Sequence, residues 1–355
     1  MRLVRMNKYK PLKSNVKYLG RAYQYKENVV LGFSASGIAF SMGRGKVEID
    51  LIGDSTVGDA NKLEERARVA FYINGKKQVD VMVDDAKKTY VFELDNDYNE
   101  ITVRKLTENA MSSVAISEIR TDDIIKPIVC KEKFIEFIGD SITCGYGVDD
   151  ENEEHSFRTE TEDCSRAYAM EAAGLLDMDF SLVSLSGYGI ISGYSDDGET
   201  RRPDQLIPSY YEKCGFSYAS ILGHQPQDLF WDFSAIKPDL IVINLGTNDA
   251  SYCKEYEDRK EWFVKDYVCF LKRVRELNSN SVILCCLGIM GEALCPYIEK
   301  AVSIYKSETN DENIFTEMFR EQLREDGLVA DSHPSSVTHK KAAKQISERI
   351  KQLLM

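Results

Sequence analysis

The sequence predicts two domains of different class: an all-β jelly-roll sandwich over residues 1–125 and an α/β/α domain with a parallel sheet over residues 126–355. Two observations support this division. Near residue 131 the hydrophobic pattern changes from a period of two residues to apolar runs that alternate with helical repeats. The first pattern is typical of antiparallel sandwiches and the second of βαβ units. In addition, a chain of 355 residues exceeds what one hydrophobic core usually organises.

In the first half, apolar and polar residues alternate over short segments that we expect to be half-buried strands. These segments are residues 46–52, 67–73, 78–83, 89–94, 100–103 and 113–116. Asn74-Gly75 separates the second segment from the third, and this dipeptide is typical of a two-residue β-hairpin turn. Many short strands without a helical repeat indicate an antiparallel sandwich of the jelly-roll type.

In the second half, apolar runs predict buried parallel strands at residues 134–138, 180–185, 240–245 and 282–287. Apolar residues recur at steps of three and four from residue 259 to 277 and again from 343 to 353, which predicts amphipathic helices. Strands that alternate with helices imply a parallel sheet with helices on both faces. Residues 121–131 interrupt both patterns and form the expected linker.

The composition restricts the classes of partner. The formal net charge is −13, which disfavours binding to nucleic acid or to an anionic membrane surface and fits a neutral substrate. No apolar run approaches the roughly 18 residues of a membrane-spanning helix. The nine cysteines include no Cys-x-x-Cys pair, so we expect free thiols, no metal site and a reducing, cytoplasmic environment. We expect no organic cofactor, and the oligomeric state remains open.

Ser141 is the candidate nucleophile. It lies in residues 139–147, which directly follow the apolar run at 134–138. A Gly-Asp-Ser tripeptide at this point places a hydroxyl on a turn at the carboxyl end of a strand, where open α/β sheets hold their binding crevice. The backbone N–H groups that follow can face a developing negative charge.

His333 is the candidate base for this serine. It is one of four histidines, and it lies just before the last amphipathic helix. Asp331, two residues earlier, can hold the tautomer of the imidazole and stabilise its charged form. Candidate donors for the oxyanion follow successive predicted strands: the Ser141 backbone N–H, the Gly187 backbone N–H and the Asn248 side chain.

These motifs resemble the four blocks of the SGNH (GDSL-type) hydrolase superfamily. The matching blocks are, in order, Gly139-Asp140-Ser141, Gly187, Gly246-Thr247-Asn248-Asp249 and His333-Pro334. More narrowly, the chain is similar to carbohydrate esterase family two, which pairs an N-terminal jelly roll with an SGNH domain and removes acetyl groups from sugars. The resemblance spans nearly the whole chain and implies a flavodoxin-like sheet in the second domain.

The resemblance implies a role for each matching residue. Ser141 would be the nucleophile and His333 the general base and then acid, while the Ser141 N–H, the Gly187 N–H and Asn248 would bind the oxyanion. Most superfamily members place the orienting aspartate three residues before the histidine, whereas Asp331 lies two before it. Some members of the esterase family use a backbone carbonyl instead. Either Asp331 or a carbonyl therefore orients His333.

Four aromatic residues are candidate sugar platforms, because aromatic faces stack on the C–H faces of pyranose rings. They are Tyr146, Tyr188, Tyr194 and Trp231. The alternative for each is packing in the core. The acidic stretch at residues 149–163 is either a solvated loop or a cleft rim that disfavours anionic substrates.

From the residues and the resemblance we expect a serine carbohydrate acetylesterase that acts on xylo-, manno- or gluco-oligosaccharides through an acetyl-enzyme. Two alternatives remain: a lipid or thioester hydrolase on the same scaffold, and a carbohydrate-binding protein with an inert cleft. Which polysaccharide is used, which hydroxyl carries the acetyl group and whether the jelly roll contacts substrate are not determined by the sequence.

Overall fold

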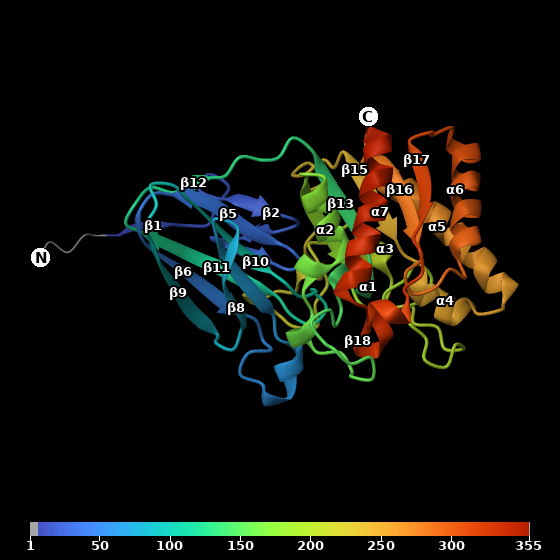
Figure 1. The fold of residues 1–355 in the computed structure, drawn as a ribbon, viewed down its shortest axis with the longest axis horizontal. Coiled ribbons are helices and arrows are strands. Elements are labelled where there is room, and N and C mark those ends of the chain that lie inside the picture. The colour runs from blue at the N-terminus through green and yellow to red at the C-terminus, as the bar shows by residue number, and fades with distance from the viewer. Residues whose placement is uncertain (1–5, 355) are drawn as a thin grey trace, which may run out of the picture. The chain divides into compact units, whose positions relative to one another are not determined.

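The computed structural model describes residues 6–354, which form two compact units (Figure 1). Unit 1 comprises the described residues of Met1–Cys130 together with Arg158–Glu162 and Lys213–Leu229. Unit 2 comprises Lys131–Phe157, Asp163–Glu212 and the described residues of Phe230–Met355. Among the helices described, none combines the length and the hydrophobicity that crossing a bilayer requires.

Unit 1 is built from antiparallel strands, as the alternating pattern predicts. The strands are β1 (Asn7–Tyr9), β2 (Lys17–Leu19), β3 (Tyr23–Tyr25), β4 (Asn28–Leu31), β5 (Gly37–Met42), β6 (Gly45–Gly53), β7 (Arg68–Ile73), β8 (Lys76–Met82), β9 (Lys87–Leu94), β10 (Asn99–Lys105), β11 (Val114–Thr121) and β12 (Lys126–Pro127). One sheet has the order β3-β4-β11-β6-β9, with β1 paired to β11. The other has the order β12-β5-β10-β7-β8, with β2 paired to β5. The jelly-roll-like sandwich is therefore confirmed.

The core of unit 1 is one hydrophobic cluster to which both sheets contribute. In β10, Ile101 and Val103 are buried, whereas Glu100 in the same strand is exposed. This alternation is what a half-buried strand requires. In β11, Ile116 and Ile119 are both buried although they are an odd number of residues apart. A β-bulge between Ile116 and Glu118 changes the phase, so both side chains reach the same core.

The predicted hairpin joins β7 to β8. Asn74 and Gly75 have φ values of 52° and 75°, which is the left-handed pair that a type I′ turn needs. Asparagine tolerates this conformation better than most residues with a Cβ, and glycine adopts it freely. The Asn74-Gly75 dipeptide therefore sets the register of the two strands.

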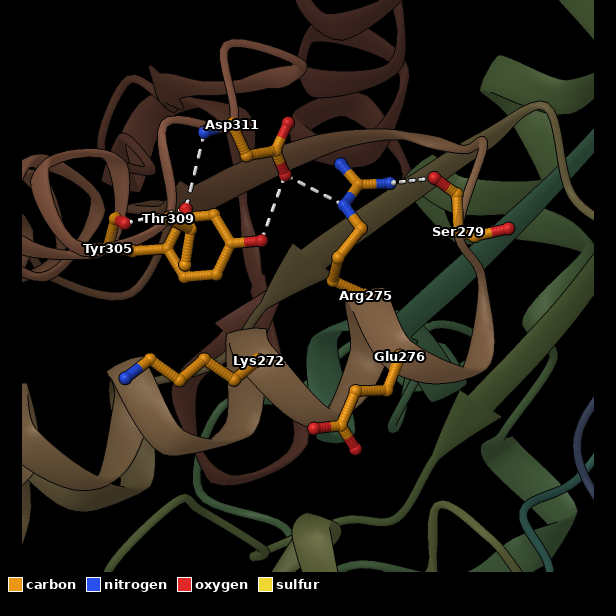
Figure 2. Close-up of a pocket in the computed structure, with 7 residues that line it drawn as sticks. All are labelled: Lys272, Arg275, Glu276, Ser279, Tyr305, Thr309 and Asp311. Carbon is orange, nitrogen blue, oxygen red and sulfur yellow. Dashed lines mark hydrogen bonds and ion pairs between the residues drawn. The ribbon is translucent and has the colours of Figure 1, made fainter.

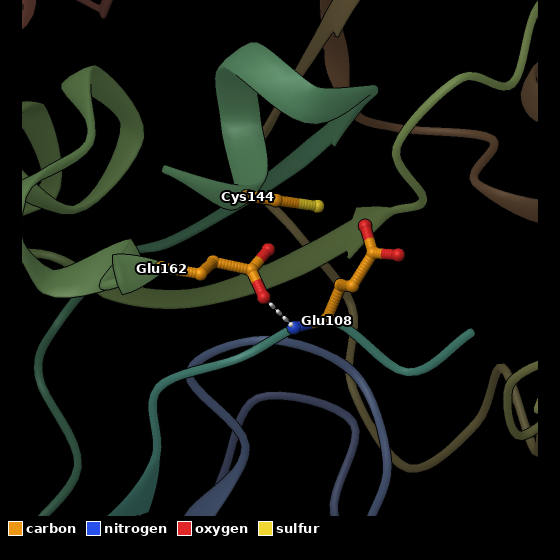
Figure 3. A group of neighbouring side chains, drawn as sticks. All are labelled: Glu108, Cys144 and Glu162. Atoms are coloured by element: carbon orange, nitrogen blue, oxygen red, sulfur yellow. Dashed lines mark hydrogen bonds between the residues drawn. The ribbon is translucent and has the colours of Figure 1, made fainter. Parts of the chain in front are cut away.

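The segment Arg158–Glu162 is held on the strands of unit 1 by hydrogen bonds. The Arg68 guanidinium donates to the carbonyls of Glu160 at 3.0 Å and Glu162 at 3.3 Å. The Glu108 backbone N–H donates to the Glu162 carboxylate at 2.9 Å (Figure 3). Alternating periodicity cannot reveal such a segment, because it is distant in sequence and forms only a short 3-10 turn, η2 (Thr159–Thr161).

Unit 2 contains a five-stranded parallel sheet. Its strands are β13 (Phe134–Gly139), β14 (Asp179–Ser184), β15 (Leu240–Asn244), β16 (Val282–Leu287) and β17 (Ile314–Met318), and a small antiparallel pair is formed by β18 (Leu328–Val329) and β19 (His333–Pro334). The order β14-β13-β15-β16-β17 is the flavodoxin-like 2-1-3-4-5 arrangement. The four apolar runs of the sequence become β13 to β16, so the predicted fold class is confirmed.

Helices flank this sheet. They are α1 (Ser141–Cys144), α2 (Tyr168–Leu175), α3 (Ile207–Tyr210), α4 (Thr247–Cys253), α5 (Glu257–Leu277), α6 (Cys295–Thr309) and α7 (Ser336–Leu354). The remaining 3-10 turns are η1 (Ala60–Glu65), η3 (Cys164–Arg166), η4 (Pro226–Asp228), η5 (Arg324–Asp326) and η6 (Ala330–Ser332). Within unit 2, α2 packs with α7 and α5 packs with α6 (Figure 1). The two predicted amphipathic helices are α5 and α7.

The strand order creates a switch point at β13. This strand pairs with β14 on one side, where Gly139 is opposite Ser184, and with β15 on the other, where Gly139 is opposite Asn244. Chain connections leave β13 and β15 in opposite directions, which opens a crevice at the carboxyl ends of the strands. The segments after β13, β14 and β15 therefore meet at one edge of the sheet.

Two glycine-to-alanine substitutions should have opposite effects on stability. A Cβ would meet no atom within 4 Å at either Gly75 or Gly174, but only Gly75 has a positive φ. We expect Gly75→Ala to lower the free energy of unfolding by about 1 kcal/mol through backbone strain. Gly174→Ala, on an exposed position of α2, should raise it by about 0.5–1 kcal/mol. Urea denaturation of both variants checks this, and equal effects would contradict the turn assignment.

Candidate active site

Ser141 lies where β13 turns into α1. The Asp140 side chain accepts the Ile142 N–H at 3.1 Å and caps the short helix. A Cβ on Gly139 would come within 2.1 Å of the Thr143 hydroxyl oxygen, so only glycine fits at this bend. The tight turn places the Ser141 hydroxyl at the carboxyl end of the strand, beside the segments that follow β14 and β15.

His333 reaches the serine from the far end of the chain. Its Nε2 lies 2.9 Å from the Ser141 Oγ. Its Nδ1 lies 3.2 Å from each of two backbone carbonyl oxygens, those of Ala330 and Asp331. Because carbonyls only accept hydrogen bonds, Nδ1 carries the proton and Nε2 has the free lone pair. The imidazole is therefore in the tautomer that can take a proton from Ser141.

The turn before His333 has an unusual backbone. Asp331 and Ser332 have φ values of 50° and 58°, a left-handed conformation that costs a non-glycine residue about 1–3 kcal/mol. Two backbone bonds hold the turn in place: the Asp331 N–H donates to His155 O at 2.9 Å and the Ser332 N–H to Glu153 O at 3.2 Å. This conformation directs the Ala330 and Asp331 carbonyls at the imidazole.

The Asp331 carboxylate has other partners than the His333 ring. It accepts a hydrogen bond from the Tyr146 hydroxyl at 2.6 Å and one from the Phe157 N–H at 3.0 Å, both at Oδ2. Of the two alternatives that the sequence left open, the structure therefore has carbonyl oxygens at Nδ1. The left-handed backbone explains this, because it turns the Asp331 carbonyl toward the ring and the side chain toward Tyr146.

Gly187 and Asn248 lie on the segments after β14 and β15. Gly187 has a φ of 80°, and nothing lies within 4 Å of the place where a Cβ would be, so its surroundings are open. The Asn248 Nδ2 donates to the Tyr188 carbonyl at 2.9 Å and to the Asp140 carboxyl at 3.3 Å. Because both segments begin at the same sheet edge as Ser141, the predicted nucleophile and oxyanion donors share one region.

Asp249 anchors the segment that carries Gly187. Its carboxylate accepts the backbone N–H groups of Ile190, Ile191 and Ser192 at 2.7–3.2 Å. Burial raises the pKa of Asp249 to about 6, and the three backbone bonds oppose that shift. Buried carboxylates need such donors to offset the loss of water. Asp249 belongs to the third sequence block, but the sequence alone assigned it no role.

Burial also shifts the pKa values of the groups nearest the serine. It lowers the pKa of His333 to about 4, and the two carbonyl bonds act in the opposite direction. It raises the pKa of Asp140 to about 7, with a smaller contribution from the charge of Asp249. At neutral pH the His333 imidazole is therefore uncharged, which is the state that a general base requires.

The four predicted sugar platforms have different surroundings. Tyr194 is 54 % exposed, and its N–H donates to the Gly187 carbonyl at 2.8 Å, so its ring is available beside the site. Tyr188 is only 2 % exposed and packs edge-on against Tyr210. Tyr146 lies between the His333 and Phe157 rings, with ring centroids 3.9 Å and 4.3 Å away. Both faces of Tyr146 are covered, so no sugar can stack on it.

Trp231 lies near the end of α5. Its backbone N–H donates to the Glu212 carbonyl at 2.9 Å, and the Glu212 side chain is paired with Arg273 at 2.6 Å. Because α5 connects the carboxyl end of β15 to the amino end of β16, Arg273 lies toward the amino edge of the sheet. The structure thus brings Tyr194 to the Ser141 edge and places Trp231 with residues of the other edge.

A separate pocket of about 430 Å³ lies between α5 and α6 (Figure 2). Arg275 Nε and the Tyr305 hydroxyl both donate to the Asp311 Oδ2, at 2.7 Å and 2.9 Å. The other two charged lining residues, Lys272 and Glu276, form ion pairs with Glu308 and Arg273. The Arg275 guanidinium also donates to the Ser281 carbonyl at 2.6 Å, which ties the end of α5 to the start of β16. These contacts serve the fold.

A family model described as GDSL-like lipase/acylhydrolase matches residues 135–346. The chain is 32% identical over 228 residues to the cellulase/esterase CelE of Acetivibrio thermocellus, which is 63% of this chain and 26% of that protein. It is 31% identical over 191 residues to an acetylxylan esterase/glucomannan deacetylase of Cellvibrio japonicus, 52% of this chain and 49% of that protein. The matched parts thus span a quarter to a half of these curated relatives.

One solved structure is similar over almost its whole length. It is a family two carbohydrate esterase from Clostridium thermocellum in complex with cellohexaose, with a TM-score of 0.81 and 25% sequence identity, covering 96% of this chain and 99% of that one. The likeness extends through the antiparallel sheets and the parallel sheet. Because the family model covers more than half of the chain, including β13 to β17 and most of α7, the chain belongs to the GDSL-like lipase/acylhydrolase family.

Proposed function

We propose that this protein is a serine carbohydrate esterase that removes O-acetyl groups from acetylated oligosaccharides. The observation that carries the proposal is the 2.9 Å contact between the Ser141 Oγ and the Nε2 of a neutral His333. The names of the relatives support it, since they include an esterase and an acetylxylan esterase/glucomannan deacetylase.

In the proposed reaction, His333 Nε2 takes the Ser141 hydroxyl proton as Oγ bonds to the acetyl carbonyl carbon. The oxyanion of the tetrahedral intermediate accepts hydrogen bonds from the Ser141 and Gly187 N–H groups. It also accepts one from the Asn248 Nδ2, which exchanges its longer bond, 3.3 Å to Asp140, for this one. As the ester C–O bond breaks, His333 returns its proton to the sugar oxygen and the alcohol leaves. Water then attacks the carbonyl carbon of the acetyl-serine and gives a proton to His333, which passes it to the Ser141 Oγ as the acyl C–Oγ bond breaks and acetic acid is released.

Substrate selection follows from the surroundings of the serine. The exposed Tyr194 ring beside Gly187 offers an apolar face to a pyranose ring. A net charge of −13 fits a neutral oligosaccharide better than an anionic one. Xylo-, manno- and gluco-type chains all meet these conditions.

A cytoplasmic location remains part of the proposal. Its support is that all nine cysteines are free, seven of them buried, which suits a reducing compartment. Cell fractionation tests it, and recovery of the protein outside the cytoplasmic fraction would contradict it.

Ser141→Ala should lower kcat/KM for an aryl acetate by about 10⁴–10⁶-fold, because the nucleophile is lost while the fold remains. His333→Ala should cost a similar factor. Ser209→Ala, at an exposed position of α3, is the matched control and should keep its rate within about twofold. Steady-state kinetics on purified proteins with matching circular dichroism spectra measure this. An unimpaired Ser141→Ala variant would refute the assignment of the nucleophile.

The acid limb of kcat/KM should fall near pH 4. The reaction needs neutral His333, and burial lowers the pKa of that group to about 4, so activity is retained above this pH and is lost below it. Asp140 and Asp249 have pKa values raised to about 7 and about 6, so their titrations lie at higher pH. A pH–rate profile checks this: a limb near pH 4 supports titration of His333, and full activity lost already at pH 5–7 would contradict the prediction.

The length of the acyl group separates the proposal from a lipid or thioester hydrolase. We expect p-nitrophenyl acetate to be hydrolysed at least about tenfold faster than the octanoate, in terms of kcat/KM. Acetylated xylo-, manno- and gluco-oligosaccharides followed by NMR would then identify the sugar and the position. Rates that rise with acyl length favour the lipid hydrolase, and sugar binding without deacetylation favours a binding protein.

A further inference from the structure

The His333 imidazole is stacked on a tyrosine. The Tyr146 ring lies 3.9 Å from it between centroids, at an interplanar angle of 20°. The Phe157 ring lies 4.3 Å from Tyr146 at an angle of 25°. His333, Tyr146 and Phe157 therefore form a stack of three rings, with the imidazole at one end and Tyr146 in the middle.

The hydroxyl of Tyr146 is fixed by Asp331. The 2.6 Å hydrogen bond to the carboxylate sets the rotation of the Tyr146 ring within the stack. The same carboxylate oxygen accepts the Phe157 N–H at 3.0 Å, and the Asp331 N–H is bound to His155 O. Asp331 therefore links Tyr146 and Phe157 by hydrogen bonds, in addition to the stacking of their rings.

The imidazole needs such support because the hydrogen bonds at Nδ1 do not fix the orientation of the ring. Nδ1 shares its single proton between two carbonyl oxygens, each 3.2 Å away, which is the long end of the N–H···O range. A bond shared between two acceptors permits the ring to tilt. Stacking on Tyr146 opposes that tilt, because it fixes the plane of the ring and so the direction of the Nε2 lone pair toward Ser141.

Resting on the proposed chemistry of Ser141 and His333, we propose that Tyr146 is a positioning residue for the general base. Its stacked ring holds the imidazole in the plane in which Nε2 meets the Ser141 hydroxyl. Asp331 acts on His333 in two ways: its carboxylate fixes the Tyr146 hydroxyl, and its backbone carbonyl accepts the Nδ1 proton. The carboxylate itself does not accept that proton.

Stacking also favours the charged state that forms during the reaction. When His333 takes the serine proton, its positive charge lies over the π face of Tyr146, which attracts cations. Because both faces of Tyr146 are covered by rings, the residue has no face to offer a sugar. Its loss should therefore change kcat and leave KM almost unaltered.

Two substitutions of Tyr146 and one control variant test the proposal, with kcat and KM measured on an aryl acetate. Tyr146→Leu removes the stack and should lower kcat by about 10–100-fold, because a small displacement of a catalytic group has a large effect on rate. Tyr146→Phe keeps the stack and loses one hydrogen bond, so kcat should fall by only about three- to tenfold. KM should stay within about twofold in both. Tyr297→Phe is the matched control, because it removes a tyrosine–carboxylate bond of 2.8 Å to Glu257 and should leave kcat unchanged.

Asp331→Asn distinguishes this arrangement from a conventional triad. The two hydrogen bonds of the carboxylate both go to Oδ2, and an amide oxygen at that place can accept both. Asparagine also tolerates the left-handed backbone. We expect kcat to fall by about two- to threefold, whereas loss of a true triad carboxylate costs about 10⁴-fold.

The outcomes are separable from a failure of the proposed function. If Ser141→Ala and His333→Ala retain activity, the proposed chemistry is wrong. If both are inactive while Tyr146→Leu keeps more than half of its kcat, only the positioning role is wrong. A loss of a hundredfold or more in Asp331→Asn would also overturn it. Where Tyr146→Leu has a lowered melting temperature, Phe157→Leu replaces it, and an unchanged kcat in that folded variant counts against the stack.

Discussion

The pairing of β13 with both β14 and β15 is the constraint on which the rest of unit 2 depends. Gly139 is opposite Ser184 on one side and Asn244 on the other, so three strands end side by side. The segments that follow them carry Ser141, Gly187 and Asn248. A parallel sheet brings carboxyl ends to one edge, and the hydrogen-bond register therefore determines the distances among residues that are far apart in the sequence.

The histidine completes this edge by a different principle. His333 arrives on a turn whose left-handed Asp331 and Ser332 point two carbonyls at Nδ1. A carbonyl carries no full charge, so it stabilises the imidazolium less than a carboxylate does, and burial lowers the pKa of His333 to about 4. His333 is therefore a weaker base than a histidine paired with a carboxylate, but it stays neutral in mildly acidic solution.

The segment at residues 153–157 shows why part of the site was invisible in the sequence. Its acidic composition indicates a solvated loop or a cleft rim, yet its backbone holds the turn before His333 and its last residue, Phe157, packs on Tyr146. From the sequence alone, Tyr146 is equally consistent with a sugar platform and with a ring that packs against other side chains. Composition states which groups are available, whereas contacts between distant segments decide which faces are covered.

By itself the sequence determined the two fold classes, ten of the nineteen strands that the structure describes, the two long amphipathic helices and the four blocks around Ser141, Gly187, Asn248 and His333. These follow from local periodicity and from short motifs, which depend on neighbours in the chain. Only the tertiary structure decided that carbonyls rather than the Asp331 carboxylate face His333, that Tyr194 is open, and that Tyr146 and Tyr188 are covered. The reason is that two adjacent left-handed residues and a contact across almost 200 positions of the chain leave no periodic signal.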